Sequence, residues 1–195
     1  MHRLASAFVL GYHGCDKSVA EQLLAGDVFK VSDNDYDWLG PGAYFWEANP
    51  LRGLEFAKEL KNSPWGADIE TPAVVGAVID LGLCLDLTTS AGIQHVAKAH
   101  NAFLEICKKA EVEPPKNSSD RDALRRPLDR AVFKTLHEIR EETGEDRIDT
   151  IRGIFTEGVP VYEGAGFYNK THIQICVCNP AQIKGVFRVP KDQLK

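Results

Sequence analysis

Residues 36–57 read YDWLGPGAYFWEANPLRGLEFA, and we expect the rest of the chain to be organised around this stretch. The Gly40-Pro41-Gly42 turn precedes a run of small and aromatic residues, Ala43 to Trp46, that is typical of a β-strand. Asn49-Pro50 then predicts a helix start, because proline is tolerated in the first helical turn, where its missing N–H costs no hydrogen bond. An aromatic strand between a glycine turn and a helix indicates either a pocket for a flat ligand or a buried core strand.

Length and composition indicate one ordinary globular domain. The chain has 195 residues, of which 44% are hydrophobic and 26% charged, so we predict a single domain over residues 1–195 with a sizeable core. The formal net charge of -5 argues against non-specific binding of nucleic acid. It leaves open a nucleic-acid substrate held by a local basic patch, for which the candidates are Arg121, Arg125, Arg126 and Arg130.

The five cysteines indicate a reducing compartment, because they are odd in number and scattered along a chain that needs no disulfides. No apolar run approaches membrane-spanning length, and the N-terminal segment is too short for a signal peptide. We therefore expect a cytoplasmic protein without a membrane partner, or an effector delivered into a cytosol. We expect no metal site, since Cys176 and Cys178 alternate along an expected strand and are taken to face opposite sides.

Hydrophobic periodicity predicts strands and helices that alternate without a repeating βαβ rhythm. The further strands are expected over Ala7–Tyr12, Ala73–Leu81, Asp149–Phe155, Thr171–Val177 and Ile183–Val189. The further helices are expected after an N-cap at Asp16, over Gly92–Ala110 and over Leu128–Thr143. This mixture predicts the α+β class with a mainly antiparallel sheet.

Three strand-borne motifs follow one another along the chain. They are Tyr12-His13-Gly14, Gly42-Ala43-Tyr44-Phe45 and His172-Ile173-Gln174-Ile175. Their order and spacing resemble the ADP-ribosyltransferase superfamily, in the His-Tyr-Glu branch that includes diphtheria toxin and the poly(ADP-ribose) polymerases. The segment Asn179 to Ile183 also looks like the polymerase ending that follows the family glutamate, and it aligns Gln174 with that glutamate.

The resemblance implies a fold and an activity. The expected fold has two mainly antiparallel β-sheets with flanking helices and an NAD cleft between the sheets. The expected activity is mono-ADP-ribosylation, in which NAD is the co-substrate, nicotinamide is released and ADP-ribose passes to a macromolecular acceptor. A bacterial toxin or effector is the expected biological role, and a neutralising antitoxin protein is then an expected partner.

The resemblance also assigns the NAD site. It implies that His13 hydrogen-bonds a ribose hydroxyl of the adenosine half and that the Gly14 backbone pairs with the nicotinamide carboxamide. Tyr44 would stack on the nicotinamide ring, and Phe56 would close the other side, as suits a positively charged pyridinium. Phe45 belongs to the same motif and is assigned to the same site.

Gln174 departs from the family pattern, in which this third catalytic position is a glutamate. An amide keeps the hydrogen bond to a ribose hydroxyl but loses the negative charge and the capacity to act as a base. This favours transfer of a single ADP-ribose over chain formation. Another carboxylate would then assist, and Glu47, Glu157 and Glu163 are the candidates.

Two other activities stay open at this point. Water could replace the acceptor, which would make the chain an NAD glycohydrolase, or the chain could be a non-catalytic module that binds NAD or ADP-ribose. The acceptor itself is not readable from the residues, although the acidic charge slightly favours a protein. The glycine-rich loop Thr156 to Lys170, with its Phe167 and Tyr168, occupies the place of the superfamily's target-recognition loop.

Overall fold

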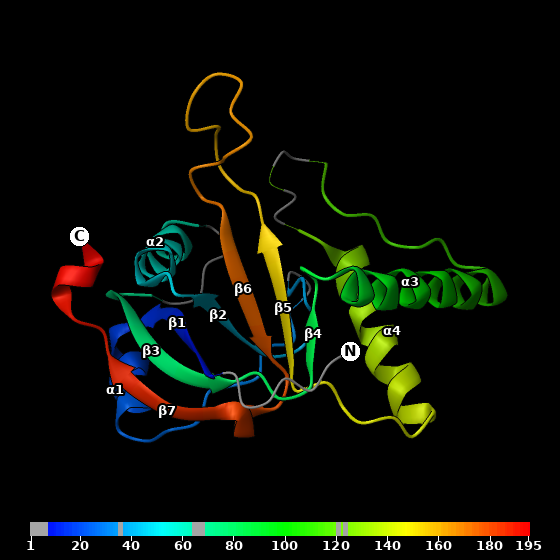
Figure 1. Cartoon of the computed structure of the whole chain (residues 1–195), viewed down its shortest axis with the longest axis horizontal. Coiled ribbons are helices and arrows are strands. Elements are labelled where there is room, and N and C mark those ends of the chain that lie inside the picture. Colours follow the sequence, from blue (N-terminus) through cyan, green and yellow to red (C-terminus); the bar gives the residue numbers. More distant parts are fainter. Residues whose placement is uncertain (1–7, 35–36, 64–68, 120–121, 123–124) are drawn as a thin grey trace.

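Figure 1 shows the computed structural model of the chain, which describes residues 8–34, 37–63, 69–119, 122 and 125–195. Ala7, Tyr36 and Arg121, which belong to the predictions above, lie outside these ranges. The strands are β1 (Phe8–Asp16), β2 (Ala43–Glu47), β3 (Pro72–Asp80), β4 (Cys84–Asp86), β5 (Thr150–Phe155), β6 (His172–Val177) and β7 (Ile183–Arg188). The helices are α1 (Lys17–Leu24), α2 (Pro50–Lys61), α3 (Ser90–Ala110) and α4 (Pro127–Glu142), with short 3-10 helices at Pro180–Gln182 and Lys191–Leu194.

The described strands form one sheet, in the order β4-β5-β6-β2-β1-β3-β7. Only β4 and β5 are parallel neighbours; the other five adjacent pairs are antiparallel. The predicted α+β class with a mainly antiparallel sheet is therefore confirmed. The prediction of two separate sheets with a cleft between them is wrong, because β1 and β2 join the two halves.

This junction between the two halves of the sheet is narrow. Within the described residues, β1 and β2 pair at Gly11↔Glu47 and Tyr12↔Trp46. Past Tyr12, β1 continues along β3, while β2 leaves it to follow β6, where Trp46 pairs with Gln174. The two halves of the single sheet thus diverge from a short seam.

The helix starts follow the side chains that the sequence supplies. Asp16 accepts a hydrogen bond from the Ser18 N–H at the start of α1, and Asn49 accepts one from the Arg52 N–H at the start of α2. These two predicted starts are confirmed. Strand β4 was not predicted, because three residues are too few to show a period. No helix in the described part of the chain is long and apolar enough to cross a membrane.

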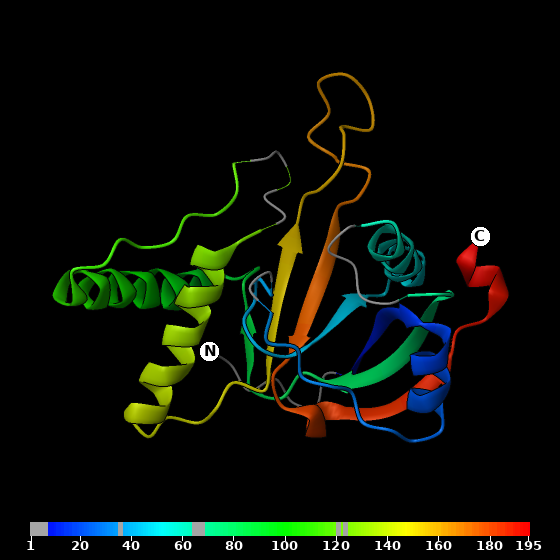
Figure 2. The same ribbon diagram turned by 180° about the vertical axis from the view of Figure 1, so that it is seen from behind.

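The helices cover the two faces of the sheet unequally. Helix α1 packs with Phe45 and Val75 on one face. On the other face, α2 lies over Tyr12 and Val74, and the α3–α4 pair lies over Cys176 and other residues of β5 and β6. Figures 1 and 2 show α2 and the α3–α4 pair on either side of β5 and β6, with the loop between these strands projecting beyond the sheet.

Helix α2 approaches β1 so closely that glycine is required at the contact. A Cβ atom on Gly14 would lie 2.0 Å from the Gly53 carbonyl oxygen of α2, well inside van der Waals distance. The glycine that the resemblance assigns to NAD binding therefore also has a packing role. It lets the helix backbone rest directly on the strand.

The prediction that Cys176 and Cys178 face opposite sides is wrong. Residues two apart on a strand share a face, and both thiols pack against the core under α3 and α4. The Cys178 sulfur lies 3.9 Å from Nε2 of His137. Among the described residues, no group of three or more His, Cys, Asp or Glu side chains is arranged to hold a metal ion.

Candidate functional site

Five polar side chains are buried together on the face that carries α2 and α4. They come from β2, α2, β6 and the loop after β5, and each residue is only 2–5% exposed: Trp46, Arg52, Glu157, His172 and Gln174. We call this group the buried polar cluster. Trp46 and Gln174 are register partners, and His172 lies two residues from Gln174, so these three side chains share one face of the sheet.

An ion pair ties the cluster to α2. The Arg52 guanidinium donates to the Glu157 carboxylate at 3.1 Å, and it also contacts the half-exposed Glu59 at 3.3 Å. The same guanidinium lies 5.9 Å from the centre of the Trp46 ring, which also neighbours the Phe56 ring at 4.7 Å and the His172 ring at 6.2 Å. Buried charges need such partners, because an unpaired buried charge is strongly destabilising.

Several polar atoms of the cluster have no hydrogen-bond partner among the described residues. They are Nε1 of Trp46, Nε of Arg52, Nε2 of His172 and Oε1 of Gln174. A buried polar atom without a partner costs roughly 1–3 kcal/mol, so a fold retains such atoms together only where something else compensates them. These unpartnered atoms include both donors and acceptors.

His172 is an acceptor in this group. Its Nδ1–H donates to the Lys170 carbonyl oxygen at 2.7 Å, which leaves the lone pair of the neutral ring on Nε2. Burial is the main cause that lowers the pKa of His172 below its ordinary value of 6.5, so the neutral ring is favoured at pH 7. The ring also stacks on Phe155 of β5, with 5.9 Å between the ring centres.

His13 lies at the seam between the halves of the sheet, on the face opposite the cluster. Its Nδ1–H donates to the Tyr44 carbonyl oxygen at 2.9 Å where β1 and β2 diverge, and its ring packs against Phe29 and Phe45. Burial lowers the pKa of His13. The structure therefore brings His13 to the backbone of Tyr44 but places its ring away from Gln174.

The aromatic residues expected at the NAD site lie in different surroundings. The Tyr44 hydroxyl donates to the Gly40 carbonyl oxygen at 2.6 Å and accepts from the Leu39 N–H, so it braces the turn before β2. Phe45 is fully buried on the opposite face, where its side chain packs in the core, and its assignment to the NAD site stays a prediction. Phe56 contacts Trp46 at the edge of the cluster. The assigned roles of Tyr44 and Phe56 toward NAD stay predictions.

The three candidate carboxylates separate clearly. Glu47 points to the opposite face, where it pairs with Arg152 at 2.5 Å and 3.0 Å. Glu163 is exposed in the loop between β5 and β6. Glu157 alone among the three belongs to the buried polar cluster, so it is the carboxylate that could assist Gln174.

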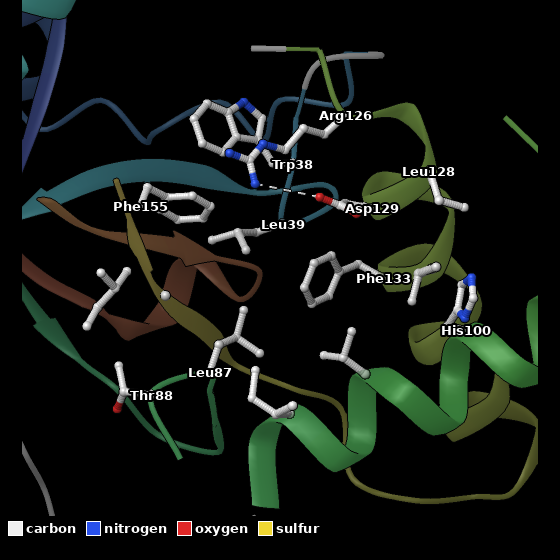
Figure 3. A pocket seen from close by; sticks show the side chains of 15 residues that line it. Trp38, Leu39, Leu87, Thr88, His100, Arg126, Leu128, Asp129, Phe133 and Phe155 are labelled. Carbon is white, nitrogen blue, oxygen red and sulfur yellow. Dashed lines mark ion pairs between the residues drawn. The ribbon is translucent and has the colours of Figure 1, made fainter. Parts of the chain in front are cut away.

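A cavity of about 460 Å³ lies beside β5, the strand that neighbours the β6 residues of the cluster (Figure 3). It lies between α3, α4, β5 and the segment before β2, and we call it the α3–α4 cavity. Its wall on β5 is formed by Gly153, Ile154 and Phe155, of which Gly153 and Phe155 are the register partners of Gln174 and His172. The cavity and the cluster therefore lie on the same face of the sheet, one strand apart.

Sequence reasoning found some of these residues and missed others. The alternation of His172 and Gln174 on a predicted strand was a usable signal that both face one side. The pairing of Arg52 with Glu157 had no local signal, because the two residues lie 105 positions apart. The burial of Trp46 likewise depends on distant segments, because its ring contacts Phe56 and Arg52 of α2 and its backbone pairs with Gln174 of β6.

No protein-family model, curated protein or solved structure matches this chain. The chain can therefore be described only by its own architecture. It is an α+β domain with one divided sheet, a buried polar cluster and an adjoining cavity.

Proposed function

We propose that this chain is an NAD-dependent mono-ADP-ribosyltransferase, which releases nicotinamide and transfers ADP-ribose to a macromolecular acceptor. The observation that carries the proposal is the buried polar cluster around Gln174, the residue that the resemblance places at the catalytic position. The cluster includes donors and acceptors without partners among the described residues, and ribose hydroxyls and a carboxamide offer complementary groups. The divergence of β1 and β2 at His13 gives further support, because an open strand edge would leave backbone groups for a ligand.

The chemistry requires a bond to break at the ribose. The C–N bond to nicotinamide breaks with its electron pair leaving on nicotinamide, an acceptor atom bonds to the same ribose carbon, and the acceptor loses a proton. Positive charge develops on the ribose during this step, so a nearby anion would stabilise the transition state. Gln174 orients a hydroxyl without supplying charge, and we assign the negative charge to Glu157. Because Arg52 shares that charge, we expect slow transfer of single units.

We further propose a toxin or effector role in a cytoplasm, with a neutralising protein as partner. This part rests on analogy with the superfamily alone. The exposed aromatic residues of the β5–β6 loop, Tyr162 at 62% and Phe167 at 70%, support its assignment to acceptor recognition, because large exposed apolar side chains mark interaction sites when they gather.

The test is nicotinamide release from NAD by the purified protein, alone and with added protein or RNA fractions. We expect Gln174→Ala to reduce release at least tenfold. Gln22→Ala is the matched control, because Gln22 is exposed on α1, which packs on the other face. We expect release to depend on one added fraction, which would identify the acceptor class.

The second candidate function is a non-catalytic module that binds NAD, which the neutral side chain of Gln174 favours. The Gln174→Glu variant distinguishes this module from the transferase. If only the charge limits transfer, this variant releases nicotinamide faster than the wild type. An absence of release from both proteins under every condition, with NAD binding retained, would refute the transferase and leave the binding module. Release that ignores every added acceptor would indicate an NAD glycohydrolase.

A further inference from the structure

The α3–α4 cavity has walls suited to a flat ring. Trp38 and Phe155 meet edge to face with 4.6 Å between ring centres, and Phe133 faces them from α4. Leucine, isoleucine and valine side chains complete most of the remaining surface. Figure 3 shows these side chains surrounding an open centre, with Leu39 and Phe133 pointing toward it. Apolar and aromatic walls of this kind are typical of small-molecule sites of 300–1,000 Å³.

The charges at the cavity are balanced. The Arg126 guanidinium lies 4.4 Å from the centre of the Trp38 ring and 5.3 Å from that of Phe155, so it is held against aromatic faces. It also pairs with Asp129 at 3.8 Å (Figure 3). Among the described lining residues, these two are the charged ones apart from the titratable His100. A phosphate or carboxylate would therefore meet a cation whose charge is already balanced by Asp129. An uncharged ring with polar edges needs no free cation and suits this cavity better.

Polar groups lie at the edges of the cavity, where they could read such a ring. Thr88 and His100 line it at separate places, and Arg126 and Asp129 supply donors and acceptors at a third (Figure 3). An uncharged ring with apolar faces and hydrogen-bonding edges is the description of a nucleobase. Aromatic side chains and arginine planes are the usual stacking partners of bases in proteins.

We propose that the α3–α4 cavity binds a nucleobase. Two sources share this chemistry, the adenine of NAD and a base of a nucleic-acid acceptor. The proposal of a base-binding site rests on the cavity, and only the choice of source rests on the proposed function. In either case a base in contact with Gly153 and Phe155 would lie one strand away from Gln174 and His172, the register partners of these two residues.

Binding of adenosine, measured without turnover, tests the site. Ribose, which lacks the base, is the control ligand, and the indole N–H signal of Trp38 in an NMR spectrum is the readout. We expect adenosine to shift this signal and ribose to leave it unchanged. Val96→Phe fills the cavity from α3 and should weaken adenosine binding at least tenfold, whereas Ile106→Phe, on an exposed position of the same helix, should not.

A thermal unfolding curve checks that Val96→Phe is folded. If it is not, Leu128→Phe, which fills the cavity from α4, takes its place. Failure of adenosine to bind, or binding that both filling variants leave unchanged, would overturn the proposal. Nicotinamide release without adenosine binding would overturn this inference alone. Adenosine binding without nicotinamide release would support it and count against the transferase.

Two further ligands distinguish the sources of the base. If the cavity takes the adenine of NAD, the wild type binds NAD more tightly than nicotinamide mononucleotide, and Val96→Phe removes the difference. If it takes an acceptor base, Val96→Phe leaves NAD binding intact and weakens binding of a short single-stranded RNA of mixed sequence. Either pattern supports a base site, and equal behaviour of wild type and variant toward all of these ligands would refute it.

Discussion

The ion pair between Arg52 and Glu157 allows a quantitative test of how the buried polar cluster is held together. Both side chains are almost completely buried, at 6% and 4% exposure, and they join α2 to the loop that follows β5. We consider the variants Arg52→Met and Glu157→Met and the double variant that carries both. Methionine approximates the volume of each side chain and removes the charge, so the cycle isolates the electrostatic contribution.

The structure sets the expected magnitude. At 3.1 Å and an effective dielectric constant of about 20, the attraction is about 5 kcal/mol. Desolvation of the two ions offsets most of it, because the penalty is several kcal/mol per ion. Each single variant leaves one buried charge unpaired and should lower the free energy of unfolding by about 3–5 kcal/mol. Glu157→Met should lie near the lower end, since Glu59 still contacts Arg52.

Urea unfolding of the four proteins measures these free energies. We expect the double variant to be more stable than either single variant, because it leaves neither charge buried alone. The exposed pair Arg147–Glu141, at 82% and 67% exposure, is the control, and Glu141→Met should cost roughly 1 kcal/mol or less. The reasoning is refuted if the single variants cost no more than this control, or if their losses simply add in the double variant.

Three further predictions concern packing, protonation and the turn before β2. Gly14→Ala should cost more than the roughly 1–3 kcal/mol of ordinary overpacking, because its Cβ would meet a helix carbonyl at 2.0 Å, whereas Gly185→Ala, with open space around it, should be tolerated in the same urea assay. Burial lowers the pKa of His13 and His172, so the folded protein binds fewer protons than the unfolded chain. The free energy of unfolding should therefore have its full value above pH 6.5 and decrease as the pH falls below 6.5, by up to about 1.4 kcal/mol per pH unit for each ring. Urea titrations between pH 7.5 and 5.5 measure this fall, which should be smaller in His172→Gln. Tyr44→Phe should cost roughly 1–3 kcal/mol in thermal or urea unfolding, because a buried turn N–H loses its acceptor.

Each of these expectations has a contrary result. Equal stability of the two glycine variants would show that α2 can move away from β1 at little cost. A pH profile that His172→Gln leaves unchanged would mean that His172 is not the group that titrates. A Tyr44→Phe variant as stable as the wild type would show that the Tyr44 hydroxyl does not stabilise the turn before β2.

Local features of the fold could be predicted from the sequence because their causes are local. At Asp16 and Asn49, a side-chain oxygen accepts a hydrogen bond from an N–H two or three positions later, and this bond starts the helix. Such a short-range contact can be predicted from the order of residues alone. The long β-branched run of β3 likewise shows its buried character directly. Strand β4 escaped, because its three residues are stabilised by pairing with β5 and not by any pattern of their own.

The candidate site was predictable only in part. Gln174 was named because of its place in a motif that resembles a known family, and its position on one face with His172 follows from the strand period. The neutral amide, from which we expected an assisting carboxylate, is also visible in the sequence. The choice of Glu157 among three carboxylates was not, since it depends on which face Glu47 takes and on the distance between the β5–β6 loop and α2.

The sequence by itself determined the α+β class, the helix caps and the order of three motifs along the chain. These follow from side-chain period, short-range hydrogen bonds and residue type, which act over a few positions. Only the tertiary structure decided that the two halves of the sheet join at β1 and β2, that Arg52 meets Glu157, and that a cavity opens between α3, α4 and β5. Those facts depend on contacts between segments far apart in the chain, whose geometry is fixed only when the helices pack on the sheet.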